Sequence, residues 1–422
     1  MSPSKTHFLF TVGGVLSGLG KGITTASIGM LLKSKGFSVT AVKIDPYISI
    51  DAGTMRPAEH GETFITDDGG ELDQDLGNYE RFLGVTLTKD HNITTGKVFQ
   101  TVIDNERHFV YDGRDAEMFP DIINEIKKRI YDKAKGFDFC LVEIGGTTGD
   151  LENLPFLHAA REIGRENQAL YLMVTFLPFL HNIGELKTKP TQHAVVALRQ
   201  VGINPDFIIT RNEVPIGQNQ IDTISARCFV DPIDIIDNPD TKNIADIPLR
   251  FAKEKLTERI LEKFNLPAKP SKLLPWNKYL DNLQNAKKII KIALIGKYVK
   301  HGDHDHKDVY VSVLEALKHA GSASKVKVLV DSFSSTDIVT HLADLKKYQG
   351  VIVPQGWGSR GTQELIQTIK YVREKKIPYL GLCFGMQLAT IEFARNVAGL
   401  KDASSEEINP KSKNLVIHLM ES

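Results

Sequence analysis

The chain has little cysteine, no excess charge of either sign and no long apolar run, and each of these absences excludes a class of protein. Its 422 residues include three cysteines, Cys140, Cys228 and Cys383, which are far apart and odd in number. This count argues against a disulfide framework and favours a reducing compartment. Basic and acidic residues number 52 each, so we expect no bulk attraction to nucleic acid or to a membrane surface.

No apolar run approaches the roughly 18–20 residues that span a bilayer, and the first residues do not form a signal-peptide pattern. We therefore expect a cytoplasmic protein. The sequence has no internal repeat and no low-complexity segment. Its length instead predicts two or three domains, each of which buries its own core.

Short apolar runs alternate with amphipathic helical patterns along most of the chain. This rhythm predicts an α/β fold, with parallel sheets covered by helices on both faces. The interval from Asp45 to Arg114 breaks the rhythm, because it is rich in Gly, Asp, Glu and Thr, and we interpret it as functional. Three prolines between Pro267 and Pro275 predict a linker. We predict domains over residues 1–267 and 289–422, joined by a linker over 268–288.

Residues 11–25, Thr-Val-Gly-Gly-Val-Leu-Ser-Gly-Leu-Gly-Lys-Gly-Ile-Thr-Thr, predict a phosphate-binding loop. Glycines let backbone N–H groups converge on phosphate oxygens, while Lys21 and the following helix N-terminus add positive potential. The usual pattern, G-x-x-x-x-G-K-[ST], is not met, because five residues separate the glycines and Gly22 follows the lysine. Thr24 or Thr25 would have to supply the missing hydroxyl. The alternative is a tight glycine turn between a strand and a helix.

Further polar residues follow other predicted strands, at the edge where doubly wound sheets bind ligands. Lys43 ends the second strand, Asp75 comes from the loop-like interval, and Glu143 closes a buried strand. A hard cation that bridges phosphates takes one or two carboxylates, so Asp75 and Glu143 are candidate Mg²⁺ ligands, although a lone acid is more often a solvated charge. The segment Lys187–Gln192 suits an anion, but alone it would be a solvated helix start.

In the second domain, residues 377–388 predict a strand, a sharp turn with Cys383 at its apex, and a helix. Such a nucleophile elbow exposes the thiol and points helix N–H groups at it, which favours the thiolate. The alternative is a buried structural cysteine. The glycine loop Gln355–Gly358 follows another strand and is a candidate oxyanion hole.

Together these residues resemble the CTP synthase family of glutamine-dependent amidoligases, which convert UTP to CTP. The resemblance covers nearly the whole chain. It is most specific in Ser17–Gly22, Lys43–Tyr47, Gly53–Met55, Glu71–Phe82, Glu143–Glu152, Lys187–Gln192 and Gly381–Gln387. It implies a P-loop-type doubly wound parallel sheet in the first domain and a flavodoxin-like α/β glutaminase domain, incomplete here, in the second.

The resemblance also implies ligand sites. ATP would be bound by Gly18, Leu19, Gly20, Lys21, Gly22, Ile23, Lys43 and Asp75, and Mg²⁺ by Asp75 and Glu143. The pyrimidine nucleotide would be bound by Ser17, Asp150, Leu151, Glu152, Lys187, Thr188, Lys189, Pro190, Thr191 and Gln192. Glutamine would be bound by Gly356, Phe384, Gly385, Met386, Gln387 and Glu407.

The resemblance implies roles as well. Cys383 would be the glutaminase nucleophile, Lys21 and Lys43 would serve phosphoryl transfer, and His60 would lie where ammonia enters. The substrates implied are UTP, ATP and ammonia or glutamine, with GTP as an effector and a homotetramer as the assembly. ATP would phosphorylate the uracil C4 oxygen, and ammonia would then displace phosphate.

Some positions depart from the family pattern. The chain ends at Ser422, before the His and Glu of the family's glutaminase triad, so we expect glutamine hydrolysis near background and free ammonia as the donor. The oxyanion loop departs at Gln355-Gly356, and the lid departs at Phe109–Gly113 and Asp115–Glu117. The pyrimidine site has no lysine within Gln220–Phe229, and the GTP site has Val311 in place of a lysine.

These departures leave alternatives to an amidoligase acting on UTP. One is a catalytically silent member that assembles with or regulates an active partner. Another is an amidoligase acting on a different uridine nucleotide, because the lid is altered. A third is an unrelated P-loop ATPase, which the Lys187–Gln192 and Cys383 segments disfavour. The retained ATP and Mg²⁺ residues favour an active amidoligase.

Overall fold

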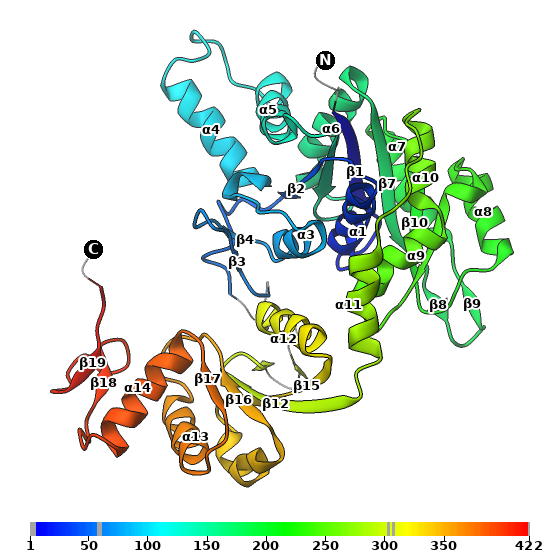
Figure 1. Cartoon of the computed structure of the whole chain (residues 1–422). Helices are drawn as coiled ribbons and strands as arrows, with labels where there is room; N and C mark the ends of the chain where they lie inside the picture. Colours follow the sequence, from blue (N-terminus) through cyan, green and yellow to red (C-terminus); the bar gives the residue numbers. More distant parts are fainter. Residues whose placement is uncertain (1–5, 57–60, 302–303, 306–308, 421–422) are drawn as a thin grey trace. The chain divides into compact units, whose positions relative to one another are not determined.

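The protein is described by a computed structural model, which covers residues 6–56, 61–301, 304–305 and 309–420. The chain divides into two compact units, Met1–Thr54 with Thr63–Leu273, and Met55–Glu62 with Leu274–Ser422. In Figure 1 each unit is a sheet covered by helices. The domain boundaries predicted above stay predictions. Helix α11, Leu274–Gln284, lies inside the segment predicted as a linker.

The first unit contains a seven-stranded parallel sheet in the order β11-β10-β7-β1-β6-β2-β5. Its strands are β1 His7–Gly13, β2 Val39–Asp45, β5 Asn92–Thr94, β6 Phe139–Ile144, β7 Ala169–Phe176, β10 Phe207–Asn212 and β11 Ile235–Pro239. Strand β1 lies between β6 and β7, where the strand order reverses. Such a switch point is where open α/β sheets bind ligands. The predicted doubly wound parallel sheet is confirmed.

Helices cover both faces of this sheet (Figure 1). On one face α1 packs against α3 and α9, and on the other α5, α6 and α7 contribute to the largest core cluster. The helices are α1 Lys21–Ser34, α3 Asp75–Leu83, α4 Thr95–Arg107, α5 Ile123–Ala134, α6 Leu154–Glu166, α7 Lys189–Gln200, α8 Gln218–Cys228, α9 Ile247–Lys253 and α10 Leu256–Lys263. Two hairpins are β3 Phe64–Ile65 with β4 Glu71–Leu72, and β8 Phe179–Leu180 with β9 Glu185–Leu186.

Alternation along the strands decides which face carries polar groups. On β6, Val142 and Ile144 lie in the core cluster formed with α5 and α6. Glu143 stands between them and therefore points to the opposite face, toward α1 and α3. Lys43 on β2 is paired in register with Glu143 and points to the same side. A buried lysine and a buried glutamate are thus neighbours beneath α1 and α3.

The interval from Asp45 to Arg114 is more regular than its composition suggested. Its described residues include helices α3 and α4, so the expectation that Asp75 comes from a long loop is wrong, because Asp75 begins α3. Leu76, Tyr79 and Phe82 recur at helical spacing and are buried against the rest of the unit. The helical spacing of these apolar residues therefore determines the local structure, although glycines and acids dominate the composition of the interval.

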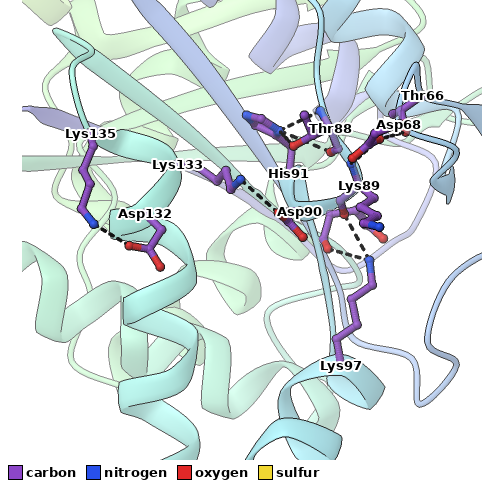
Figure 2. Close-up of polar contacts among 11 residues, drawn as sticks. Thr66, Asp68, Thr88, Lys89, Asp90, His91, Lys97, Asp132, Lys133 and Lys135 are labelled. Carbon is purple, nitrogen blue, oxygen red and sulfur yellow. Dashed lines mark hydrogen bonds and ion pairs between the residues drawn. The ribbon is translucent and has the colours of Figure 1, made fainter.

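Polar contacts attach the β3–β4 hairpin and α4 to the sheet edge (Figure 2). In the hairpin turn Asp68 accepts hydrogen bonds from the backbone N–H of Lys89 at 3.1 Å and from the Thr66 hydroxyl at 2.5 Å. Lys97 of α4 donates through Nζ to the carbonyls of Lys89 at 3.2 Å and Asn92 at 3.1 Å. These contacts fix β5, which pairs with β2 beside Lys43.

The second unit contains a four-stranded parallel sheet in the order β15-β12-β16-β17. This is the beginning of the flavodoxin-like order, as predicted. The strands are β12 Lys288–Gly296, β15 Val326–Ser334, β16 Gly350–Val353 and β17 Tyr379–Gly381. Helices α13 Thr362–Glu374 and α14 Phe384–Asn396 share one apolar core with the sheet, and α12 Val311–Ser324 joins another. The described residues of this unit also form the 3₁₀ segment Ile338–Lys347 and two short strand pairs. These are β13 Lys300–His301 with β14 His304–Asp305, and β18 Ser404–Ser405 with β19 Leu415–Ile417.

Within the ranges that the structure describes, no helix is both long and apolar enough to cross a membrane.

Candidate active site

The glycine loop after β1 forms the turn that the sequence predicted. Gly18 and Gly20 have φ of 71° and 79°, in the left-handed region that favours glycine, and Gly20 is the N-cap of α1. Lys21 is the first residue of α1 and is buried, and its Nζ donates a hydrogen bond to the Gly146 carbonyl at 2.8 Å. The loop after β1 is thereby joined to the loop after β6, with Ser17 exposed at the loop surface.

Lys43 is surrounded by three carboxylates. Its Nζ lies 2.8 Å from Asp45 Oδ1, 3.5 Å from Asp73 Oδ1 and 3.1 Å from Asp75 Oδ2. Burial alone would lower the pKa of Lys43, but these carboxylates outweigh it and raise the pKa well above its usual value. For Lys21 burial prevails and lowers the pKa, despite the attraction of Glu143. Lys43 is therefore a fixed cation.

A carboxylate occupies the place of the missing P-loop hydroxyl. A Cβ added at Gly22 would lie 2.0 Å from Asp75 Oδ1, so a side chain at this position would displace the Asp75 carboxylate. The Thr25 hydroxyl, one of two expected substitutes, instead donates to Thr11 at 2.9 Å in the buried layer between α1 and β1. The departure from the usual loop pattern is thus the consequence of an acid that enters from α3.

Glu143 is held from the same helix. The Tyr79 hydroxyl donates a hydrogen bond to Glu143 Oε2, and both side chains are buried. Burial, with a further contribution from the Asp75 charge, raises the pKa of Glu143 to about 8. Burial also raises the pKa of Tyr79 well above its usual value, so its hydroxyl remains a donor.

The two carboxylates suit Mg²⁺ in the presence of a nucleotide. Asp75 and Glu143 present hard oxygen donors beside two lysines, which is the donor set that Mg²⁺ uses when phosphates and waters complete its shell. In the part of the chain that the structure describes, no three His, Cys, Asp or Glu side chains form a complete metal cage. The residues present therefore fit a cation that is bound together with phosphate.

The residues predicted for the pyrimidine nucleotide follow β6 and β7, on either side of β1. Asp150 accepts hydrogen bonds from the backbone N–H and the hydroxyl of Thr147, at 2.6 and 2.9 Å, and so shapes its own loop. Thr191 is buried at the start of α7, with its hydroxyl 3.2 Å from that of Thr175 at the end of β7. Lys187 pairs with Glu185 at 2.7 Å. Leu151 and Glu152 are exposed.

This cluster also includes residues that were not among the predicted site residues. Asp45 binds Lys43, Asn92 donates through Nδ2 to Asp45 Oδ2 at 2.7 Å, and Tyr79 holds Glu143. The signal for Asp45 was its place two residues after Lys43 on a strand, which puts both side chains on one face. The signal for Tyr79 was its place four residues after Asp75 on a helix. Asn92 carried no comparable signal, because β5 was not expected.

The lid segment follows α4 and closes with an ion pair. Arg114 contacts both carboxylate oxygens of the buried Asp121, with Nη1 2.7 Å from Oδ2, and Asp121 Oδ2 also accepts a hydrogen bond from the Glu117 N–H at 2.9 Å. The segment borders a cavity of about 600 Å³ together with apolar residues of α4 such as Phe99 and Val102. The altered lid residues thus form an ordered turn.

In the second unit Cys383 lies at a strained turn between β17 and α14. Its φ of 49° and ψ of −106° place it in the left-handed half of the map, and its side chain is exposed. A Cβ at Gly385 would lie 2.0 Å from the Val353 carbonyl, so the turn packs directly against β16. Of the residues predicted to bind glutamine, Phe384 is buried and Met386 is exposed. This is the elbow geometry that exposes a nucleophile.

The predicted oxyanion loop is held by two charged side chains. Lys297 donates through Nζ to the carbonyls of Trp357, at 3.0 Å, and Gly358, and lies 4.0 Å from the centre of the Phe384 ring. Burial lowers the pKa of Lys297 to about 8. Glu407 accepts a hydrogen bond from the Gly358 N–H at 2.7 Å.

Gln355, which departs from the family pattern, also makes a side-chain hydrogen bond. Its side-chain amide donates to Glu62 at 2.9 Å, and Glu62 belongs to the second unit. His60, which was predicted at the ammonia entrance, lies outside the described residues.

Comparison with known proteins agrees with this architecture. Residues 7–266 match the family model described as CTP synthase N-terminus, and residues 305–419 match Glutamine amidotransferase class-I. The chain is 48% identical over 421 residues to the CTP synthase of Caldanaerobacter subterraneus subsp. tengcongensis, covering 98% of this chain and 77% of that protein. The chain belongs to the CTP synthase family. The CTP synthases of Pyrococcus abyssi, 47% identical, and Methanocaldococcus jannaschii, 46% identical, match over 98% of this chain and 77% and 78% of their own lengths.

CTP synthase family membership confirms the resemblance found in the sequence, and with it the ligase assignment and the use of ATP. Individual residue roles stay predictions. Most of the predicted ATP, cation and pyrimidine residues lie at or after the ends of neighbouring strands of a single sheet, and Asp75 reaches Lys43 from α3. Of the predicted glutamine residues, Phe384–Gln387 follow Cys383 at the start of α14, and a Cβ added at Gly356 would lie 3.7 Å from the Phe384 ring.

Proposed function

We propose that this chain catalyses the ATP-dependent amination of UTP to CTP, with ammonia derived from glutamine. The observation that carries the proposal is the intact group Lys21, Lys43, Asp75 and Glu143 at a sheet switch point, in a chain 48% identical to a CTP synthase over 98% of its length. A catalytically silent member would have no need of this costly buried cluster of charges. The silent alternative is therefore not favoured.

The chemistry requires a better leaving group at uracil C4. The C4 carbonyl is a poor electrophile toward ammonia, so the γ-phosphoryl group of ATP is transferred to the C4 oxygen. Ammonia then adds to C4, loses a proton, and the C4–O bond breaks with release of phosphate. Lys21 and Lys43 would neutralise charge that develops on the transferring phosphoryl group. Mg²⁺, held by Asp75 and Glu143, would supply further neutralisation of the phosphates.

The pyrimidine nucleotide would lie along the loops after β6 and β7. The proposal places its phosphates near Ser17 and the Lys187–Gln192 segment, because α7 begins there and two lysines flank the helix N-terminus. Asp150, Leu151 and Glu152 would contact the other end of the nucleotide.

In the second unit the Cys383 thiolate would attack the glutamine amide carbonyl and release ammonia, and water would hydrolyse the resulting thioester. Gly356, Phe384–Gln387 and Glu407 would hold glutamine. The expectation from the sequence, free ammonia in place of glutamine, is the alternative that the parallel glutamine reaction described below tests. GTP as an activator of the glutamine-dependent rate is likewise a proposal that derives from the family.

We also propose a homotetramer, which is the assembly that the family resemblance implies. Large apolar side chains are exposed on α4 and the segment after it, and contiguous apolar patches mark association surfaces on soluble proteins. The residues are Ile103, Phe109, Val110, Met118 and Phe119.

The proposal is tested by incubating the chain with ATP, UTP and Mg²⁺ and separating the nucleotides by chromatography. Ammonium should give CTP and equimolar ADP, and a parallel reaction with glutamine measures the glutaminase step. Lys21→Ala should lose turnover by about 10²-fold or more, since a phosphate-clamping charge is lost. Lys128→Ala, which alters an exposed helix lysine, is the control. Absence of CTP with ammonium, or full turnover in Lys21→Ala, would refute the proposal.

A further inference from the structure

Tyr79 is buried in a place that packing alone does not explain. It lies in α3 with no exposed surface, and its hydroxyl reaches across to the carboxylate of Glu143 on β6. A phenol that is buried must find a hydrogen-bond partner, and here that partner is an acid whose own burial is costly. The contact therefore joins the helix that carries Asp75 to the central sheet.

The two candidate cation ligands are held by different kinds of group. Asp75 Oδ2 is 3.1 Å from the charged Nζ of Lys43, while Glu143 Oε2 accepts a hydrogen bond from the neutral Tyr79 hydroxyl. A neutral donor fixes the orientation of a carboxylate without cancelling its charge. Because Tyr79 takes one oxygen, it also fixes the plane in which the other oxygen, Oε1, is presented.

We propose that Tyr79 is a positioning residue for the nucleotide-bound divalent cation, acting through its hydrogen bond to Glu143. The inference rests on the proposed function, because the cation site at Asp75 and Glu143 is itself proposed. Groups that orient metal-ligating carboxylates in this way commonly matter 10–100-fold for metal affinity or activity, about the range expected here. No contact between Tyr79 and ATP or UTP is required.

The competing explanation is that the hydroxyl only stabilises the fold. Tyr79→Phe separates the two, because it keeps the buried ring and removes the donor. The matched control is Tyr171→Phe, since the Tyr171 hydroxyl also makes an internal hydrogen bond, 2.9 Å to the Ala160 carbonyl, away from the cluster. A purely structural role predicts that both variants lose some thermal stability and keep wild-type affinity for the cation.

The experiment measures Mn²⁺ binding to the full chain in the presence of β,γ-imido-ATP by electron paramagnetic resonance. We expect Tyr79→Phe to bind Mn²⁺ about 10–100-fold more weakly and Tyr171→Phe to bind as the wild type does. In turnover with ammonium, Tyr79→Phe should need more Mg²⁺ for half the maximal rate. At saturating Mg²⁺ its kcat should return to within about twofold of the wild type, because Tyr79 acts on the ligand and not on substrate.

Incorporation of para-aminophenylalanine at position 79 restores a donor on the same ring, and it should restore the affinity. This variant also covers the case in which Tyr79→Phe folds poorly. Wild-type Mn²⁺ affinity in Tyr79→Phe, together with weakened binding in Glu143→Gln, would overturn the inference and leave the proposed function standing. Wild-type affinity in Glu143→Gln as well would show that the cation site was placed wrongly.

Discussion

Gly22 shows at the scale of one residue how this loop differs from the usual phosphate loop. A serine or threonine normally follows the lysine and supplies a hydroxyl to Mg²⁺. Here the Asp75 carboxylate fills the space where that side chain would begin, 2.0 Å from a Cβ built on Gly22. The position after the lysine is therefore a glycine because an acid from another helix occupies the space.

This account predicts that restoring the usual residue is harmful. Gly22→Ser should displace Asp75 and lower kcat for CTP formation by about 10²-fold, as a displacement of roughly 1 Å at a reacting centre does. Ammonium-dependent turnover measures the effect, and far-UV circular dichroism checks the fold. Equal or faster turnover in Gly22→Ser would contradict this explanation.

Lys297 provides a prediction on pH at the same scale. Burial lowers its pKa to about 8, whereas in the unfolded chain a lysine titrates near about 10.4. Between these values the unfolded state binds more protons, so the free energy of unfolding should rise with pH across this window. Below pH 8 Lys297 is charged in both the folded and the unfolded state, so it lowers the free energy of unfolding by its full amount.

The comparison with Lys297→Met isolates this contribution. Between pH 7.5 and pH 9.5 the wild type should gain thermal stability relative to Lys297→Met, since the two chains share every other titrating group. Scanning calorimetry at the two pH values gives the difference. A gap in unfolding temperature that stays constant with pH would show that Lys297 titrates normally.

At the scale of elements, the sequence predicted the strands better than the helices between them. Strand β7, for example, has a long and uninterrupted apolar run, the kind of pattern from which the strands were predicted. Helix α3 was missed, although Leu76, Tyr79 and Phe82 follow helical spacing, since acids and glycines dominate the composition around it. Tyr79 was consequently missed as well. The predicted site residues Lys21, Lys43 and Glu143 stood out because charged groups after an apolar strand or a glycine loop are conspicuous in any α/β sequence.

The lid is the element that the sequence could not describe, because its order depends on one ion pair. Replacing Arg114 with Met leaves the carboxylate of Asp121 without its cation, which should lower the stability of this segment. Limited proteolysis should then cut faster within residues 109–117. The control is Arg107→Met, which removes an exposed arginine. Equal cleavage rates in both variants would count against a lid held by Arg114.

At the scale of the whole molecule, the exposed apolar surface around Phe109 is the feature that a single chain does not explain. Phe109 has a φ of 58°, which a bulky residue rarely adopts, and its side chain is exposed. Aspartate tolerates this conformation better than phenylalanine. Phe109→Asp should therefore leave the fold intact and weaken association between copies.

Light scattering with ATP and UTP present measures the assembly. The wild type should have the mass of a tetramer, Phe109→Asp a smaller mass, and Ile233→Asp, which changes another exposed apolar side chain, the wild-type mass. A monomeric wild type, or a tetrameric Phe109→Asp, would contradict the proposed assembly.

The central claim is that the cluster of Lys21, Lys43, Asp75 and Glu143 transfers phosphate to the C4 oxygen of UTP before ammonia attacks. The most direct measurement uses UTP labelled with ¹⁸O at C4, with ATP, Mg²⁺ and ammonium, and analyses the released phosphate by ³¹P nuclear magnetic resonance. The account predicts that each inorganic phosphate carries one ¹⁸O atom and that CTP and phosphate form in equal amounts. Unlabelled phosphate, with CTP formed at the normal rate, would contradict it.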